Sequence, residues 1–398
     1  IATTTSLTAS AATSVYGGAV TYTATVGVTD HSAGTPTGSV TFYSGSTVLG
    51  VGELDANGQA TFTTSRVNAG VQTITTSYSG EGAFSGSVSN ALSQTVARAP
   101  LSIAGGSRTK VYGAALTLQP IYSGFVNGDT AASLSTLPTL RTTATAASPV
   151  GIYPVDFSGA ASNNYTISYV SGTLSITPAS LSVLADNKSI YCGQAIPTLT
   201  ATYSGFVNGD SVADLVSPAI LSTTATPASP YGTYTILARG VSIPNYTVTY
   251  TDGSLTLNRS STTTTLAVPS IPSYYGEAVT LTATITNPYG TPTGTVSFYD
   301  RTQDRSLGSL VLDGSGRASL TTSSLGAGGH SIEVKYWGNQ MFVNPYESFE
   351  TYNHLVMPAP LTVAVDSKSK VYGAAMPYLG LSYSGFVNGE TEGSLGQG

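Results

Sequence analysis

Hydrophobic and polar residues alternate along most of the chain in short runs. In the segment 38–50, Val40 and Phe42 alternate with polar residues, and a Ser-Gly-Ser turn follows. A period of two among β-branched and aromatic residues is typical of half-buried β-strands. The sequences Asp-Ala-Asn-Gly at 55–58 and Asp-Gly-Ser-Gly at 313–316 each separate two such runs. We therefore predict hairpin turns there, with glycine at positive φ.

A helical period is not sustained beyond one or two turns. The exception is the polar segment that begins at Asn127, together with its copy that begins at Asn208. In these two segments, Asp129 and Asp210 are expected to cap one short helical turn. The pattern therefore predicts an all-β fold with a short helical turn in each copy of this segment.

The chain also repeats itself. The octapeptide Tyr-Ser-Gly-Phe-Val-Asn-Gly-Asp occurs at 122–129 and at 203–210, and it recurs at 383–390 with Glu as its last residue. A second family of repeats matches 34–43 with 290–299, 16–26 with 275–285, and 54–65 with 312–323. Self-similarity of this kind indicates a tandem array of small modules.

Two types of module follow from these spacings, and we name them by residue range. We predict a first long module (1–98), a first short module (99–179), a second short module (180–258) and a second long module (259–357). The last range (358–398) matches the first half of a third short module. The sequence is therefore expected to be a piece of a longer protein.

Each residue of the octapeptide has an expected structural role. Tyr122, Gly124 and Phe125 are expected to close a strand, and Asn127 with Gly128 to form a turn. The alternative is that the terminal acids bind calcium or a sugar, namely Asp129, Asp210 and Glu390. Calcium takes six to eight oxygen ligands, and each module supplies only one acid at this place, which favours the structural interpretation.

The predicted joints between modules are short and contain proline. Pro100, Pro178 and Pro360 each stand just before a predicted first strand. Proline fixes its own φ and makes the preceding residue extended, so such joints are semi-rigid spacers. Strands of about eight residues span roughly 25 Å, so the whole piece is expected to be a rod on the order of 150 Å long.

Two tyrosines are expected to form corners of the kind found in immunoglobulin-like sandwiches. Tyr153 and Tyr234 stand at the start of a late strand, where such a hydroxyl bonds back to the backbone upstream. His330 has the equivalent position in the second long module, so we interpret it as a corner residue and not as a metal ligand. His31 and His354 are interpreted as lying in unrelated places.

Composition excludes several classes of function. Only 9% of the residues are charged, against about a quarter in ordinary soluble domains, and the net charge is −6. No basic stripe is present, which argues against nucleic-acid binding. No apolar run reaches the roughly 18 residues of a membrane span. Cys192 is the only cysteine, so no intrachain disulfide is possible, and a small buried residue is expected there.

Catalytic and metal-binding motifs are missing from the sequence. There is no Gly-x-Ser-x-Gly, no phosphate-binding loop, no His-Glu-x-x-His and no Cys-x-x-Cys, and three histidines with one cysteine cannot build a zinc site at a usual spacing. We therefore predict no catalytic residue, no cofactor and no metal, and we predict that this segment is not an enzyme.

The segments 36–84 and 292–338 resemble the bacterial Ig-like repeat, and 110–179 resembles the bacterial module called MBG. The resemblance covers essentially the whole chain. It implies a tandem array of small Ig-like β-sandwich modules in a secreted or cell-surface bacterial protein, often an adhesin, with no catalytic residues to transfer. One departure is that Tyr-Ser-Gly-Glu-Gly-Ala-Phe at 78–84 becomes Tyr-Trp-Gly-Asn-Gln-Met-Phe at 336–342.

This departure begins an aromatic-rich stretch that runs to Tyr352. We expect Trp337, Tyr346 and Phe349 to form a partly exposed patch that contacts a neighbouring chain or a glycan. The alternative is that Phe342 takes the place of Phe84 and the other aromatics cover the end of the sandwich.

The function expected from the sequence is that of a non-catalytic stalk or fibre segment of a long extracellular surface protein. Its partners would be other copies of the chain or neighbouring modules, with surface glycans as a further class. A carbohydrate- or protein-binding array and the accessory region of a secreted enzyme remain as alternatives.

Overall fold

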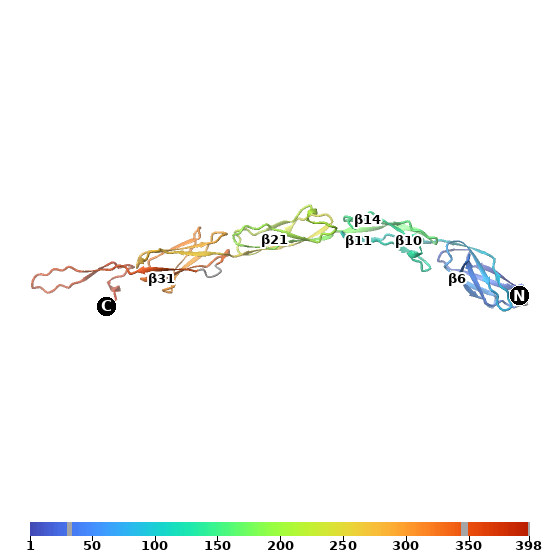
Figure 1. The fold of residues 1–398 in the computed structure, drawn as a ribbon, viewed down its shortest axis with the longest axis horizontal. Coiled ribbons are helices and arrows are strands. Elements are labelled where there is room, and N and C mark those ends of the chain that lie inside the picture. The colour runs from blue at the N-terminus through green and yellow to red at the C-terminus, as the bar shows by residue number, and fades with distance from the viewer. Residues whose placement is uncertain (30–33, 344–348, 397–398) are drawn as a thin grey trace. The chain divides into compact units, whose positions relative to one another are not determined.

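The computed structural model describes residues 1–29, 34–343 and 349–396. Its contacts divide the chain into two compact units. The first unit contains Ile1–Leu181, Gly205–Asp214 and Ile243–Thr247, and the second contains Ser182–Ser204, Leu215–Ser242 and Val248–Gly398. The described residues of both units form β-strands and a few single-turn 3-10 helices, which confirms the predicted all-β class (Figure 1).

The first long module consists of two sheets. One has the order β1-β3-β6, with bounds Thr3–Ala9, Val20–Val28 and Gln59–Thr64. The other has the order β2-β9-β7-β4-β5, with bounds Thr13–Val15, Leu92–Ala97, Gly70–Tyr78, Ser39–Ser44 and Thr47–Glu53, and β8 (Ser87–Val88) also pairs with β7. Alternate residues of β3 are buried, and Val40 and Phe42 of β4 are fully buried, so the predicted alternation is confirmed.

The first short module also has two sheets. In the smaller one, β10 (Ala99–Ala104) lies between β12 (Ile121–Ser123), which is antiparallel to it, and β15 (Tyr165–Val170), which is parallel. The larger one has the order β11-β16-β14-β13, with bounds Ser107–Val111, Gly172–Thr177, Gly151–Ser158 and Thr139–Arg141.

The second short module repeats this arrangement. Its smaller sheet has the order β19-β17-β22, with bounds Ala201–Ser204, Ala179–Ala185 and Tyr246–Thr251. Its larger sheet has the order β18-β23-β21-β20, with bounds Lys188–Tyr191, Gly253–Asn258, Gly232–Arg239 and Ile220–Thr223. The two copies of the short type therefore share one topology, as their sequences do.

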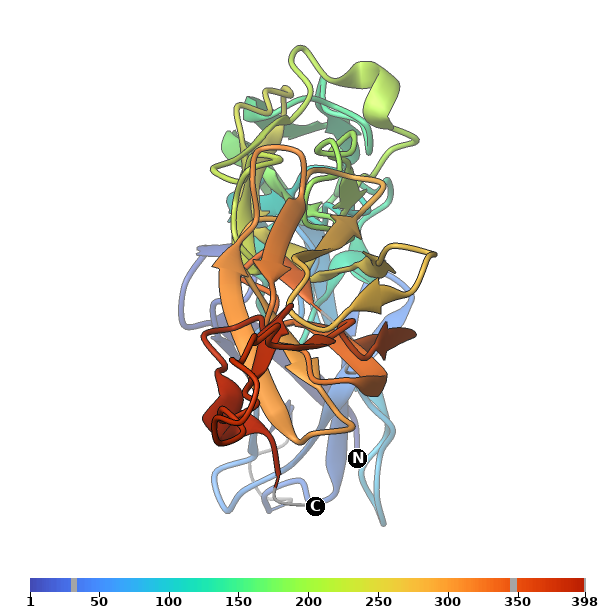
Figure 2. The ribbon, with the colours of Figure 1, turned by 90° about the vertical axis from the view of Figure 1, so that its left-hand side faces the viewer.

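The second long module, drawn in orange in Figure 2, repeats the topology of the first. One sheet has the order β25-β27-β30, with bounds Thr263–Ala267, Val279–Thr286 and Arg317–Thr322. The other has the order β26-β33-β31-β28-β29, with bounds Ser273–Tyr274, Phe349–Met357, Gly328–Tyr336, Thr295–Asp300 and Arg305–Val311. Two short strands, β24 (Ser260–Ser261) and β32 (Phe342–Val343), pair with each other, and in the third short module β34 (Thr362–Val365) pairs with β35 (Leu381–Ser384).

A single 3-10 turn follows each octapeptide, which confirms the prediction made for the first two copies. These turns are η2 (Ala131–Ser133), η3 (Val212–Asp214) and η4 (Glu392–Ser394). Both predicted caps are wrong, because the Thr130 hydroxyl accepts from the Ala132 amide in η2 and the Ser211 hydroxyl accepts from the Ala213 amide in η3. The Asp129 side chain is engaged elsewhere. The predicted hairpin turns are present, with positive φ at Gly58 and Gly316.

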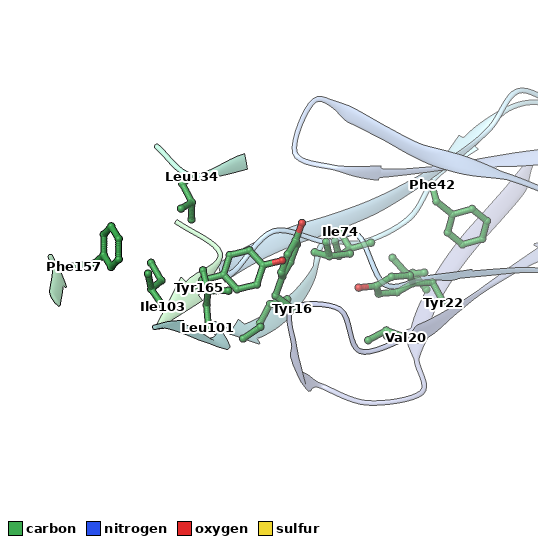
Figure 3. Close-up of a cluster of buried hydrophobic side chains, with 14 of the residues drawn as sticks. Tyr16, Val20, Tyr22, Phe42, Ile74, Leu101, Ile103, Leu134, Phe157 and Tyr165 are labelled. Atoms are coloured by element: carbon green, nitrogen blue, oxygen red, sulfur yellow. The ribbon is translucent and has the colours of Figure 1, made fainter. Parts of the chain in front are cut away.

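Buried apolar side chains form one continuous cluster in the first unit, from Leu7 in the first long module to Ala179 at the end of the first short module. Figure 3 shows the rings of Tyr16 and Tyr165 side by side within this cluster. Both tyrosines are buried. The core therefore continues through the joint between these two modules. Across the described residues, no helix is long and apolar enough to cross a membrane.

Candidate functional site: the joints between modules

The last residue of the first octapeptide binds two tyrosines from two different modules. Asp129 Oδ2 accepts hydrogen bonds from Tyr16 Oη of the first long module, at 3.1 Å, and from Tyr165 Oη of its own module, at 2.7 Å. The two rings meet edge to face, with centroids 5.6 Å apart and an interplanar angle of 86°. Hydrogen bonds to a charged acceptor are stronger than neutral ones, and this ring geometry is favourable. The octapeptide is thus a contact element for the preceding module.

The middle of the octapeptide packs on the same neighbour. Val126 lies against Gly17, where a Cβ would stand 2.5 Å from Val126 Cγ2 and where φ is +89°. Both the close approach and the backbone conformation therefore require glycine. Asn127 Oδ1 accepts from the Ser65 hydroxyl at 2.6 Å, and Asn127 Nδ2 donates to the Ser65 carbonyl at 2.9 Å.

A second contact comes from the residue before Tyr165. Asn164 Oδ1 accepts from the Ala69 amide at 3.0 Å, and Asn164 Nδ2 donates to Asn68 Oδ1 at 3.1 Å. The Asn164 carbonyl also accepts from the Ala99 amide, the first residue of β10. The Asn-Tyr pair therefore connects the preceding module with the central strand β10 and the edge strand β15 of its own sheet.

The joint between the two short modules repeats part of this construction. Its contacting residues also lie within the first unit, although the second octapeptide belongs by sequence to the second short module. Tyr246 Oη donates to Asp210 Oδ2 at 2.7 Å, and its ring meets Tyr112 edge to face at 5.6 Å. Asn245 Oδ1 accepts from the Val150 amide at 2.9 Å, as Asn164 does from Ala69.

In the second unit, the third octapeptide repeats part of the contact. Tyr275 Oη donates to Glu390 Oε1 at 3.1 Å, and Asn388 Nδ2 donates to the Ser323 carbonyl at 3.2 Å. Val387 lies so close to Gly276 that a Cβ there would stand 2.6 Å from Val387 Cβ. Glutamate thus replaces aspartate without loss of the bond to tyrosine.

The joint that precedes the second long module is different. The long module has no octapeptide, and the Tyr-Gly of the other joints is replaced by Cys192-Gly193. Cys192 is fully buried, as predicted, and Gly193 approaches the Tyr289 carbonyl. Arg259 stacks over the Tyr231 ring at 4.2 Å. The Tyr-Gly tyrosine is therefore present in each module whose next neighbour carries an octapeptide with its acid. It is replaced by Cys192 in the module whose next neighbour has no octapeptide.

Burial and the adjacent carboxylates keep the joint tyrosines protonated. Desolvation, together with Asp129, raises the pKa of Tyr165 to about 12, and desolvation with Asp210 raises the pKa of Tyr246 to about 12. Both hydroxyls are therefore hydrogen-bond donors across the physiological pH range. Within the described parts of the chain, no three His, Cys, Asp or Glu side chains are grouped so that they could hold a metal ion.

The predicted corner residues take their expected roles. Tyr153 Oη donates to the Pro149 carbonyl and Tyr234 Oη to the Pro230 carbonyl, both at 2.9 Å. His330 Nε2 lies 2.7 Å from the Gly326 carbonyl, and its Nδ1 lies 2.7 Å from the buried Asp300 carboxylate. Because both ring nitrogens face acceptors, neither is available to activate a nucleophile.

The prediction that His354 lies in a place unrelated to His330 is wrong. It lies directly opposite His330 on the paired strands β31 and β33, buried, with Nε2 2.9 Å from the Ser273 hydroxyl. In the first long module, Gln72 and Gln94 form the equivalent cross-strand pair. Residues that cannot ionise occupy the equivalent positions in that module, which indicates a structural role for the histidine pair.

The predicted aromatic patch is described only in part. Trp337 is 64% exposed, its Nε1 donates to the Ser297 hydroxyl at 2.9 Å, and Lys335 Nζ lies 4.5 Å from its ring. Tyr346 lies outside the described residues, and Phe349 is the first residue of β33, with its side chain not described. Phe342 is buried.

Sequence reasoning identified the octapeptide but not its partner. The available signal was the Tyr-Gly pair, which occurs near the start of every module except the second short one, where it is Cys192-Gly193. The second short module is followed by the second long module, which contains no octapeptide. Reading the two motifs together would have placed them in contact.

Comparison with known proteins agrees with the two module types. The model of the MBG domain (YGX type) matches residues 101–175, 181–256 and 361–398, and that of the bacterial Ig-like domain (group 3) matches 7–97 and 264–349. A search of curated proteins finds no match.

Several solved structures are similar at low identity. A tetra-tandem repeat from the extending region of a large adhesion protein is 14% identical, covers 89% of this chain and 99% of its own, and has a TM-score of 0.30. Invasin, a bacterial integrin-binding protein, is 14% identical, with coverages of 92% and 81% and a TM-score of 0.32. A calcium-stabilised adhesin with which an Antarctic bacterium binds ice is 12% identical, with coverages of 89% and 99% and a TM-score of 0.26. Likenesses this distant carry no argument about function.

Family matches, strand order and repeated joints agree with one another along the sequence. The chain is a tandem array of modules that match two families, the bacterial Ig-like domain and the MBG domain.

Proposed function

We propose that this chain is a non-catalytic stalk segment of an extracellular, adhesin-like bacterial surface protein, and that its modules follow the boundaries given above. The observation that carries the proposal is that each short module which follows another module contacts a tyrosine of that neighbour. Tyr16 and Tyr275 donate to the next module's carboxylate, and Tyr112 packs edge to face on Tyr246, which holds Asp210. A chain of independent domains needs no such contacts, because flexible linkers suffice to connect them. Contacts that fix each module to the previous one are what a spacer under load requires.

Other features agree with a mechanical role. The modules carry few charges, and their hydrogen-bonded hydroxyls lie between strands, as in the pairs Thr21–Thr63 and Thr280–Thr321. The two matched families, the bacterial Ig-like domain and the MBG domain, are present as repeated modules along this chain. We accordingly place the segment outside the cell, with copies of the chain, neighbouring modules or surface glycans as its partners.

Small-angle scattering on the full chain tests the stalk. We expect a rod on the order of 150 Å long, because strands of about eight residues span roughly 25 Å in each module and the joints are fixed. A double variant, Asp129→Ala with Asp210→Ala, should broaden the distance distribution at unchanged mass. A compact particle with a radius of gyration near 23 Å, as for a globule of this length, would contradict the proposal.

A binding function is the second candidate, and the exposure of Trp337 favours it. A large, exposed aromatic ring stacked with Lys335 is a surface that proteins and sugars use. We propose that Trp337, Tyr346 and Phe349 form one interaction patch. Trp337→Ser, the residue of the first long module, should weaken self-assembly or adhesion to glycan-coated surfaces and shift the melting temperature by no more than about 2 °C.

Val311→Ser is a matched control for this variant, because Val311 is also largely exposed and lies in the same module. Loss of stability with assembly and adhesion intact would show that Trp337 has a packing role only.

A further inference from the structure

The joint between the first long module and the first short module contains a polar cavity of about 350 Å³. All of its lining residues belong to the first unit. They are Asn68, Ala69, Gly70, Arg98, Asn163 and Asn164. Three side-chain amides and one guanidinium make this lining hydrophilic. Small-molecule sites usually measure roughly 300–1,000 Å³, so this cavity has room for one small, hydrophilic ligand.

One asparagine of the lining positions its neighbours. Asn164 Oδ1 accepts from the Ala69 amide at 3.0 Å, and Asn164 Nδ2 donates to Asn68 Oδ1 at 3.1 Å. Both polar atoms of the Asn164 side chain are thus engaged within the joint. The bond to Asn68 uses its carbonyl oxygen and leaves its Nδ2 group as a donor.

Arg98 supplies the only charge in the cavity lining. Its Nε donates to the Asn163 carbonyl at 3.0 Å, which leaves the two Nη groups as donors for a further acceptor. Among the residues that the structure describes, no carboxylate forms an ion pair with this exposed arginine. A guanidinium binds the two oxygens of a carboxylate in one plane, so the cavity is complementary to a ligand with a carboxylate.

The second joint shows that these polar side chains are not needed to hold two modules together. There, Asn245 makes two of the bonds that Asn164 makes in the first joint, with its side-chain oxygen and with its carbonyl. The residues equivalent to Asn68, Arg98 and Asn163 are nevertheless all prolines, namely Pro149, Pro178 and Pro244. Proline has no side-chain donor. The polar trio of the first joint is therefore an addition to a contact that folds without it.

We propose that this cavity binds a hexuronate, a sugar that carries a carboxylate. The Nη groups of Arg98 bind the carboxylate, and the amides of Asn68 and Asn163 bind hydroxyl groups of the ring. A side-chain amide has both a donor and an acceptor, as a hydroxyl does, and this match favours a sugar over an acidic peptide. The site belongs to the first unit, whereas Trp337 belongs to the second, and it does not depend on the stalk function.

Saturation-transfer NMR on the full chain tests the class of ligand, with D-glucuronate as the probe. We expect saturable binding. D-glucose has a hydroxymethyl group in place of the carboxylate, so it should bind at least about tenfold more weakly, because the bonds to the guanidinium are lost. Equal binding of the two sugars would overturn the proposal. A tetraglutamate peptide that binds more tightly than glucuronate and displaces it would also overturn it, since the ligand would then be an acidic peptide.

Variants of Arg98 test the carboxylate contact. Arg98→Gln should weaken glucuronate binding about tenfold, and Arg98→Lys should restore only part of the loss, because lysine keeps the charge but not the planar pair of donors. Arg141→Gln is the matched control, because this exposed arginine donates to the Ser158 hydroxyl outside the cavity. It should leave binding unchanged. An equal loss in the control, or no loss in Arg98→Gln, would contradict the assignment.

The prolines of the second joint allow binding to be separated from folding. The double variant Arg98→Pro with Asn163→Pro should abolish glucuronate binding and shift the melting temperature by no more than about 2 °C, because the second joint has proline at both positions. In the natural chain, glucuronate should shift the amide resonances of Asn68, Ala69 and Gly70. Binding that survives in the proline variant, or resonance shifts confined to the second unit, would place the sugar elsewhere and overturn the proposal.

Discussion

At the scale of single residues, the stability of each joint depends on a few side chains. In the first joint, one carboxylate accepts from two tyrosines, and a glycine lets a valine approach the backbone. Hydrogen bonds to charged groups contribute about 1.5–3 kcal/mol each when their partners are well placed. Such a contact adds to the coupling that the continuous apolar core already provides between the two modules.

Asp129→Ala tests this coupling. Two tyrosine hydroxyls lose their acceptor, and one of them, on Tyr165, retains a contact with the Val126 backbone, so we expect a loss of about 1–3 kcal/mol in the unfolding free energy of the first joint. Hydrogen exchange should show faster exchange of the Val126 and Ala69 amides, with the amides of β3 unchanged. Asp55→Ala is the control, because its carboxylate holds only the turn amides of Asn57 and Gln59. Equal exchange at the joint in both variants would contradict the role of Asp129.

At the scale of elements, the regularly paired strands β31 and β33 carry buried ionisable side chains inside the second long module. His330 and His354 lie opposite each other, near Asp300 and the Arg301–Glu333 ion pair. Desolvation by burial, together with the neighbouring His330, lowers the pKa of His354 below its ordinary value of 6.5. The first long module has glutamines at both histidine positions, so only one of the two copies is sensitive to acid through this pair.

The stability of the second long module should therefore fall as the pH falls below 6.5. Below that value, the unfolded chain binds a proton at His354 that the folded module resists, so protonation favours unfolding. Denaturant titrations at pH 7 and pH 5 should show this loss. His354→Gln, the residue of the first long module, should reduce the difference in unfolding free energy between the two pH values. An unchanged difference would show that other groups control the acid response.

At the scale of the whole molecule, tyrosine hydroxyls donate hydrogen bonds to the joint carboxylates of the described residues. Addition of millimolar calcium, or its removal by a chelator, should therefore move the melting temperature by no more than about 1 °C, because a ligand that does not bind the folded state does not stabilise it. A rise of many degrees with calcium would reveal an ion site. Magnesium at equal ionic strength is the control for screening effects.

Periodicity and repeats in the sequence were sufficient to predict the all-β class, the hairpin turns at Gly58 and Gly316, and the corner roles of Tyr153 and Tyr234. These features depend on local pattern, on glycine conformation or on short sequence separation. The role of Asp129 could not be obtained in this way. Its partner Tyr16 lies 113 residues away in the other type of module, and a local rule for helix caps gave a different assignment.

The replacement of Tyr-Gly by Cys192-Gly193 has a consequence for how such arrays change during evolution. A gene duplication that copies a module from its first residue to its last carries the octapeptide but leaves the receiving Tyr-Gly in the upstream neighbour. A functional joint is therefore inherited only when the Tyr-Gly of the upstream module and the octapeptide of the downstream module are kept together. Insertion of a short module directly after the second short module, which carries Cys192, would leave the inserted carboxylate with only the tyrosine of its own module as a donor. We therefore expect stalk length to change most readily by the addition of short modules that carry Tyr-Gly next to one another. Each new boundary then has both a Tyr-Gly and an octapeptide.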